Sequence, residues 1–278
     1  LKNVKSNTSY KEFEQMVNKA KKYIYEGEIF QVVISRIFQK TIDVEPLSIY
    51  RALRNLNPSP YLFFINFKEF KIVGSSPEIL IKLKDKKVTI RPIAGTRKRG
   101  SNMREDKKIE NDLLNDPKEI SEHLMLLDLG RNDISRVTKP GTVKVTDKMY
   151  IEYFSHVMHI VSNINGELDG RNGTTDVLFS GFPAGTVTGA PKIRAIEIIE
   201  ELEKSKRNIY AGSVGYISFN GDIDTCIALR TALIKDHKIY IQSGAGIVAD
   251  SKPKNEFIET ENKALALLTA CAYAHNFE

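Results

Sequence analysis

The sequence has 278 residues, 41% of them hydrophobic and 27% charged, so it can bury a sizeable core and is neither disordered nor fibrous. Its 41 basic and 35 acidic residues give a net charge of +6, which suits an anionic small substrate or an ordinary basic surface. The basic residues are scattered and no nucleic-acid module accompanies them, so we do not expect a nucleic-acid partner. Two cysteines without metal-ligand spacing, short apolar runs and no signal peptide favour a cytoplasmic protein without disulfides, structural zinc or membrane contact.

The apolar pattern predicts one continuous unit of helices and strands. A first helix is capped by Thr8 or Ser9 and ends at Gly27, and further helices are expected over residues 46–57, 103–115, 117–129, 191–204 and 251–274. Strands are expected over residues 29–38, 61–67, 70–75, 79–83, 87–92, 142–145, 156–165, 211–219, 224–234 and 238–242. Runs of strands between groups of helices favour large antiparallel-rich sheets covered by helices. We therefore expect a single domain over residues 1–278.

Two pairs of glutamates have the spacing of metal ligands on helices. Glu119 and Glu122 lie three residues apart, as do Glu256 and Glu259, so each pair shares one helix face. Four carboxylates without a soft ligand favour a hard cation, magnesium before calcium or zinc. Glutamate in a first helical turn also complements the helix dipole, which is the structural alternative for each pair.

Three glycine-rich segments could receive an anionic ligand. Gly95-Thr96 is expected in a turn at a strand end, residues 182–192 lead into a helix, and residues 243–246 follow a strand. Glycine allows a ligand to approach the backbone, and threonine hydroxyls and backbone N–H groups can bind a carboxylate. Each segment could equally be an ordinary turn. By default, His123, His156 and His159 are core or surface residues.

Three motifs point to a known family. Residues 122–133 (EHLMLLDLGRND), 182–192 (FPAGTVTGAPK) and 244–251 (GAGIVADS) resemble the chorismate-utilising enzymes, with the strongest likeness to the synthase component of anthranilate synthases. The resemblance runs from about Tyr23 to about Leu268. It implies an α+β fold, a layered α/β/β/α arrangement of two large, mostly antiparallel sheets with the active site between them. Family members are typically longer at the N-terminus, so we expect that upstream region, which carries the tryptophan feedback site in many anthranilate synthases, to be absent or divergent.

Matching positions in the family imply a metal and substrate site. Glu122 and Glu259 correspond to direct magnesium ligands, and Glu119 and Glu256 to carboxylates that bind the metal through water. The metal would hold the ring carboxylate of chorismate. Further ring-carboxylate contacts are implied for Gly95, Thr96, Gly244, Ala245 and Gly246. Tyr210 and Arg230 correspond to a clamp on the enolpyruvyl carboxylate, a role that suits the bidentate donor geometry of arginine.

The resemblance also implies catalytic roles. Glu78 corresponds to the general acid that protonates the departing C4 hydroxyl, and His159 to a residue tied to the loss of pyruvate. Lys263 lies near the metal carboxylates in family members. A carboxylic acid that is neutral near pH 7 needs a raised pKa, from burial or from neighbouring carboxylates.

Two positions predict the product. Family members that add water carry a lysine base where this sequence has Gln31, and aminodeoxychorismate synthases usually carry a lysine nucleophile at the position of Ala94. Neither glutamine nor alanine can do that chemistry, so the resemblance implies attack by ammonia and elimination of pyruvate to give anthranilate. Ammonia would come from a separate glutamine amidotransferase subunit. The alternatives are an aminodeoxychorismate synthase component I of the folate pathway, an enzyme that stops at 2-amino-2-deoxyisochorismate, and a non-catalytic chorismate-like binder or basic nucleic-acid protein.

Overall fold

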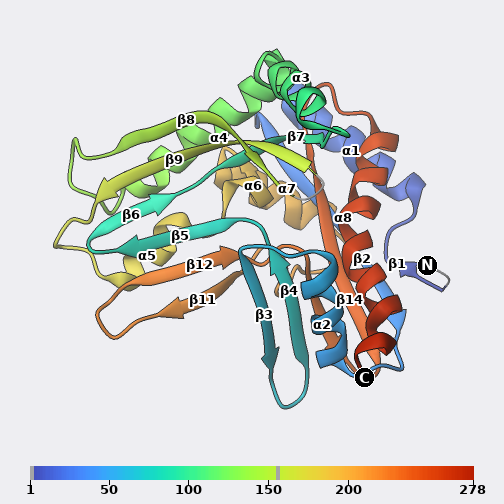
Figure 1. The fold of residues 1–278 in the computed structure, drawn as a ribbon. Coiled ribbons are helices and arrows are strands. Elements are labelled where there is room, and N and C mark those ends of the chain that lie inside the picture. The colour runs from blue at the N-terminus through green and yellow to red at the C-terminus, as the bar shows by residue number, and fades with distance from the viewer. Residues whose placement is uncertain (1–2, 155–156) are drawn as a thin grey trace. The chain divides into compact units, whose positions relative to one another are not determined.

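The computed structural model describes residues 3–154 and 157–278 (Figure 1). The chain forms two compact units: unit 1 comprises Leu1–Pro77, Val187–Ser213 and Cys226–Glu278, and unit 2 comprises Glu78–Thr186 and Val214–Thr225. The chain passes between the units several times, so neither unit is one contiguous segment. A single catalytic domain over residues 1–278 stays a prediction.

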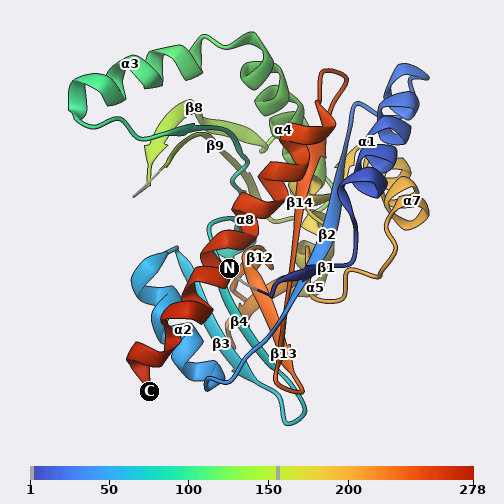
Figure 2. The ribbon, with the colours of Figure 1, turned by 90° about the vertical axis from the view of Figure 1, so that its right-hand side faces the viewer.

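Unit 1 contains a seven-stranded sheet with helices. The strand order is β1 (Lys5–Ser6), β2 (Gln31–Thr41), β14 (Lys238–Ile247), β13 (Thr231–Lys235), β4 (Lys71–Ser76) and β3 (Tyr61–Asn66), and β10 (Gly189–Ala190) also pairs with β2. These neighbours run antiparallel. The helices are α1 (Tyr10–Tyr25), α2 (Pro46–Leu56), α7 (Lys192–Leu202), α8 (Pro253–Tyr273) and the 3-10 helix η1 (Ala274–Phe277). Figure 2 shows α8 alongside β14 and β2.

The side chains on the two faces of β2 have different partners. Val32 and Ile34 pack with α1 and α7, and Phe38 packs with α2 and α8. Successive side chains of a strand point to opposite faces, so Gln31 and Ser35 lie on the other face of the sheet. Both are buried although they are polar. Gly244 and Gly246 face the same side, because they pair with Ser35 and Val33.

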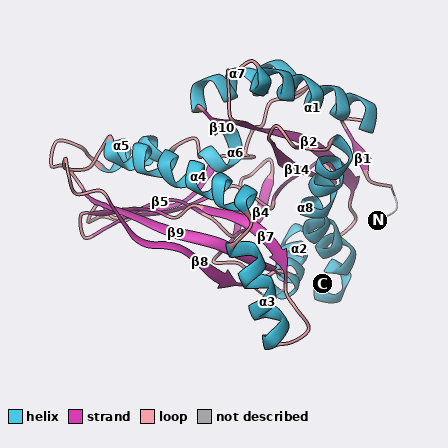
Figure 3. Cartoon of the chain, turned by 90° about the horizontal axis from the view of Figure 1, so that it is seen from above, coloured by secondary structure: helices cyan, strands magenta, loops and turns pink. Residues whose placement is uncertain are grey.

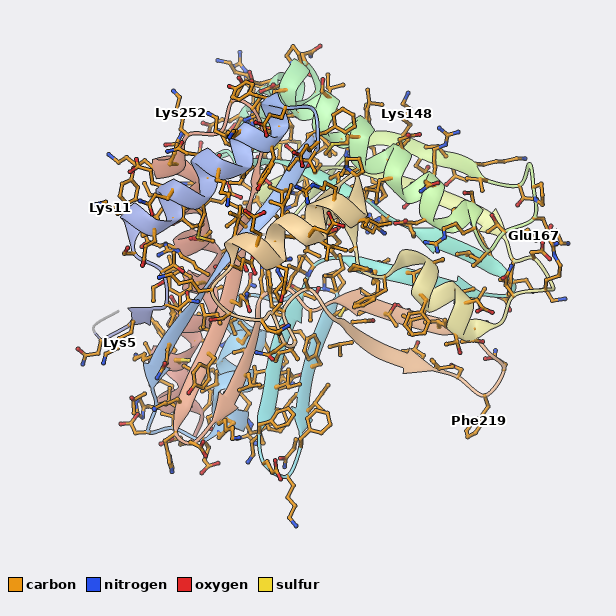
Figure 4. All side chains as sticks on the ribbon, turned by 180° about the vertical axis from the view of Figure 1, so that it is seen from behind. Lys5, Lys11, Lys148, Glu167, Phe219 and Lys252 are labelled. Carbon is orange, nitrogen blue, oxygen red and sulfur yellow. The ribbon has the colours of Figure 1, made fainter. Side chains whose placement is uncertain are left out.

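Unit 2 contains a second seven-stranded sheet. Its order is β11 (Ser213–Ile217), β12 (Ile223–Ile227), β5 (Ile79–Lys84), β6 (Lys87–Ile90), β9 (Val157–Glu167) and β7 (Ile93–Lys98), and β8 (Lys144–Tyr153) pairs with β9. Its helices are α3 (Met103–Leu114), α4 (Pro117–Ser135) and α5 (Thr174–Gly181), and the short α6 (Gly185–Thr188) follows. Figure 3 shows α4 lying over the strands of this sheet, and Phe219 projects from the turn between β11 and β12 (Figure 4).

The structure confirms the predicted α+β class with two large antiparallel sheets, and Ser9 caps α1 as predicted. The predicted strand over residues 224–234 is wrong, because β12 and β13 belong to different sheets and the chain turns between them. That turn holds Arg230 at a φ of 45°, a left-handed conformation that no sequence pattern indicates. Helix α5 was not predicted. His156, where another strand was expected to begin, lies outside the described residues.

None of the described helices has the length and apolar character needed to cross a membrane.

The two thiols are shielded from solvent. Cys226 and Cys271 are both free and buried, and burial raises the pKa of Cys271 to about 12. A protonated, inaccessible thiol is a poor nucleophile. We therefore expect the native protein to react with a chromogenic thiol reagent only very slowly, and to release two equivalents of chromophore once it is unfolded in urea. Rapid reaction of either thiol in the native protein would contradict this burial.

Candidate functional site

A group of polar contacts in unit 1 centres on Gly244. Lys263 donates from Nζ to the Gly244 carbonyl at 3.0 Å and pairs with Glu259 at 2.7 Å. The Tyr210 hydroxyl lies beside Gly244, whose N–H group offsets part of the rise in the Tyr210 pKa. A Cβ at Gly244 would lie 2.8 Å from that hydroxyl oxygen, so only glycine fits here without displacing the ring. The structure thus brings together three predicted site residues of unit 1 around one glycine.

Residues 244–246 lie within β14, so the predicted turn after a strand is wrong. In the described chain β2 pairs with β14 up to Ile247, whereas β13 pairs with it only up to Ile241. Beyond Ile241 one edge of β14 is therefore open to other partners. The C=O of Gly244 bonds to Lys263 rather than to β2. Residues two apart along a strand present their backbone groups to the same edge, so the N–H and C=O of Gly246 also point away from β2. This edge supplies the N–H donors that were expected from a turn.

Gln31 lies beside Gly246. A Cβ at Gly246 would come within 2.5 Å of the Gln31 amide nitrogen, so the glycine leaves room for this side chain. Gln31 is only 3% exposed, and Ala245 between the two glycines is fully buried. The residue that the family resemblance uses to predict the nucleophile therefore contacts the glycine edge of β14.

Tyr210 is held by a buried ion pair that the sequence analysis missed. The Arg207 guanidinium lies 5.4 Å from the centre of the Tyr210 ring and pairs with Glu203 at 2.6 Å. Arg207 also donates to the carbonyls of Val33 and Val187 at 2.7 and 2.6 Å. Burial raises the pKa of Tyr210 to about 12, so its phenol stays protonated and can donate to an anion. In the sequence, the only sign of this pair is its spacing: Glu203 and Arg207 lie four residues apart, just after the end of α7.

Arg230 and Glu256 are the remaining predicted site residues of unit 1. The turn after Tyr210 bonds to the turn before Arg230, through Ala211 N–H to Ala228 O at 3.2 Å and Ala228 N–H to Gly212 O at 2.8 Å. The carbonyl of Arg230 accepts from Ser75 N–H. Glu256 is half-buried in the first turn of α8, one turn before Glu259.

A second group forms in unit 2 at a bulge in β7. The register with β9 shifts between Ala94 and Thr96, and Gly95 has a φ of 68°, so the expected strand-end turn is instead a β-bulge inside a strand. His159 Nδ1 lies 3.0 Å from Gly95 O and 3.1 Å from Thr96 Oγ1. A carbonyl can only accept, so the contact with Gly95 favours the form of His159 that carries its proton on Nδ1.

Helix α4 places the first glutamate pair next to this bulge. Asp116 caps the helix, accepting from the N–H groups of Lys118 and Glu119, and Pro117 starts it as predicted. Glu119 Oε2 lies 3.2 Å from where a Cβ of Gly95 would be, and Glu119 Oε1 accepts from Arg97 at 2.9 Å. Glu122, one turn further along α4, is partly buried.

Two further predicted residues of unit 2 are buried. Glu78 is 8% exposed and directly precedes β5. His123 is fully buried with Nε2 at 2.7 Å from Ser162 Oγ, and burial lowers its pKa to about 4. His123 is therefore a neutral core histidine, the default reading of the sequence. Its neighbour Glu122 is the residue of the motif that is expected to meet a ligand.

The glutamates have the chemistry of a hard-cation site. The four carboxylates offer only oxygen donors, which suit magnesium. In the described ranges, no group of three or more His, Cys, Asp or Glu side chains is arranged to hold a metal ion. Glu119 and Glu259 are instead paired with Arg97 and Lys263, so cationic side chains neutralise one carboxylate of each pair.

Comparison with known proteins identifies close relatives. The family model described as chorismate binding enzyme matches residues 1–269. The chain is 57% identical over 274 residues to anthranilate synthase component 1 of Aquifex aeolicus, and 55% identical over 274 residues to that of Cereibacter sphaeroides. Both alignments cover 99% of this chain, but only 56% and 55% of the relatives. The chain therefore spans about half the length of the curated relatives that it matches.

Solved structures share the fold. The crystal structure of anthranilate synthase component I from Streptococcus pneumoniae superposes with a TM-score of 0.90 at 45% identity, covering 95% of this chain and 59% of that one. The menaquinone-specific isochorismate synthase of Escherichia coli superposes with a TM-score of 0.89 at 28% identity, covering 97% and 62%. One fold thus serves enzymes with different products, so product identity depends on individual residues.

Proposed function

Since this chain belongs to the chorismate binding enzyme family, we propose that it converts chorismate and ammonia to anthranilate and pyruvate, a step of tryptophan biosynthesis. The observation that carries the proposal is 57% identity, over 99% of the chain, to a relative named anthranilate synthase component 1. Gln31 and Ala94 support it, because neither side chain can act as the lysine base or lysine nucleophile of other family members. Both side chains are buried, so a base or nucleophile from solvent has little room to replace the missing lysine.

Magnesium is the proposed metal. Enzymes of this family are generally metal dependent, and the four glutamates match the oxygen donors that this ion prefers. Glu122 and Glu259 would bind the ion directly, and Glu119 and Glu256 through water. When bound, the ion supplies positive charge for the ring carboxylate of chorismate. Side chains and backbone groups of the protein would bind the rest of the substrate.

Chorismate is a dianion, so its two carboxylates need separate donors. Thr96, at the Gly95 bulge, and the open edge of β14 over Gly244–Gly246 offer a hydroxyl and N–H groups for the ring carboxylate. Tyr210 and Arg230 are assigned to the enolpyruvyl carboxylate. This assignment is supported by the protonated phenol of Tyr210 and by the bonded turns that carry the two residues. Lys263, tied to Gly244 and Glu259, would fix the geometry of both.

Two residues are assigned to proton transfer. Glu78, shielded from solvent, would protonate the departing C4 hydroxyl while ammonia attacks C2. His159 is assigned to the later elimination of pyruvate. Its Nδ1 contact with Gly95 directs the basic Nε2 away from the bulge, which suits a group that accepts a proton.

Incubation of the protein with chorismate, magnesium and ammonium should produce the fluorescence of anthranilate. Omission of ammonium, or chelation of the metal, should abolish the signal. We also propose a glutamine amidotransferase subunit as the cellular source of ammonia, so glutamine should replace ammonium only when that subunit is added. Formation of 4-amino-4-deoxychorismate, of 2-amino-2-deoxyisochorismate without anthranilate, or of isochorismate would overturn the assignment in favour of the corresponding relative.

A further inference from the structure

Arg97 lies at the junction of the bulge in β7 and the start of α4. Its guanidinium donates from Nη1 to Glu119 Oε1 at 2.9 Å and from Nη2 to Asp116 Oδ2 at 2.7 Å. Nε lies 3.5 Å from Asp112, and Nη1 also donates to the carbonyl of Thr96 at 3.2 Å. One side chain therefore connects the strand that carries Thr96 to the cap and the first turn of the helix that carries Glu119.

These contacts leave Glu119 with one defined oxygen for a further partner. Oε1 is engaged by Arg97, whereas Oε2 lies at the Gly95 bulge, 3.2 Å from the position that a Cβ would take. The Glu119 side chain is only 18% exposed, so few other orientations are open to it. A carboxylate fixed through one oxygen presents the other in a constant direction, which is what an outer-shell partner of a metal requires.

We propose that Arg97 is a positioning residue for the metal: by fixing Glu119 Oε1 and the Asp116 cap, it directs Glu119 Oε2 toward a metal-bound water. The inference rests on the proposed function, because it takes Glu119 as the water-mediated partner of the ion. It adds an arginine to which the sequence analysis assigns no role.

Lysine cannot replace Arg97 in this role. The guanidinium is a planar fork that reaches Asp116 and Glu119 with separate nitrogens, whereas an ammonium is a single point charge on a flexible stem. Arg97→Lys therefore keeps the positive charge and removes the forked arrangement of donor nitrogens. This separates positioning from electrostatics, because loss of the charge alone would strengthen the attraction of the site for a cation.

The test is a titration of the whole chain with Mn²⁺, followed by the paramagnetic resonance signal of the free ion, without chorismate. We expect Arg97→Lys to raise the dissociation constant about 10- to 100-fold, the usual effect of losing an outer-shell partner. Arg99→Lys is the matched control, since Arg99 forms a similar fork to Asp106 at the start of α3 without touching Glu119. The control should bind Mn²⁺ like the wild type.

A double variant shows whether Arg97 acts through Glu119. In a Glu119→Gln background, Arg97→Lys should lower the Mn²⁺ affinity little further, because the two changes remove one shared interaction. Unchanged Mn²⁺ affinity in Arg97→Lys, or a fully additive loss in the double variant, would overturn the proposal for Arg97. No weakening in Glu119→Gln, or no binding by the wild type, would instead refute the proposed metal site itself. Circular dichroism and the melting temperature of each variant show whether the fold is retained.

Discussion

We expect Glu122→Gln and Glu259→Gln each to lower kcat/KM for chorismate by about 1000-fold or more, because both side chains are proposed metal ligands. A metal supplies several kcal/mol of charge stabilisation, and about 4 kcal/mol corresponds to about 1000-fold in rate. Glutamine has nearly the shape of glutamate, so the fold should persist while the negative charge that holds the cation is lost. The measurement is the initial rate of anthranilate formation at saturating ammonium over a range of magnesium concentrations.

The control for this pair is Glu200→Gln. Glu200 is an exposed residue of α7 that pairs with Lys206 at 3.1 Å, and the same substitution there should leave the rate unchanged. High magnesium should restore part of the activity of the two site variants if weakened binding is the cause. Normal rates in either Glu122→Gln or Glu259→Gln would refute a direct role for that glutamate and would favour a non-catalytic binder.

Gly189→Ala should lower the stability by about 3 kcal/mol or more, the largest effect we expect from a single methyl group. Gly189 has a φ of 137°, which L-residues rarely adopt, and a Cβ there would lie 2.2 Å from the carbonyl oxygen of Gln31. Backbone cannot move aside as a flexible side chain can. Because β10 pairs with β2 at this point, the substitution also displaces Gln31 from the glycine edge of β14.

Gly170→Ala is the matched control, because nothing lies within 4 Å of its Cβ position and its φ is not in the left-handed range. It should change the stability by no more than about 0.5 kcal/mol. Urea or thermal unfolding monitored by circular dichroism measures both variants against the wild type. Equal stability of Gly189→Ala and Gly170→Ala would show that the backbone at Gly189 can relax freely.

The long amphipathic elements could be predicted from the sequence because their signals are local. Ser9 with Glu12, and Asp116 with Pro117, are caps that a short window reveals, and both begin helices in the structure. The turn at Arg230 could not be found this way. The apolar run on either side of it reads as one strand, and only the pairing of β12 and β13 with different sheets requires the break.

The site was less visible than the fold. The spacing of Glu119 and Glu122 equally suited helix-dipole complementation, and the family resemblance rather than the spacing predicts that they serve a metal. The bulge at Gly95 reads as a turn because bulges and turns both use glycine in the left-handed region. Contacts such as those of Arg97 or Arg207 join residues far apart in sequence, so no local pattern contains them.

We propose above all that this chain makes anthranilate with nitrogen taken from ammonia. The most direct test is to incubate it with chorismate, magnesium and ammonium enriched in nitrogen-15, and to identify the products by chromatography and mass spectrometry. We predict anthranilate that carries the heavy nitrogen, together with one equivalent of pyruvate. Labelled 4-amino-4-deoxychorismate, or unlabelled isochorismate, would contradict the account.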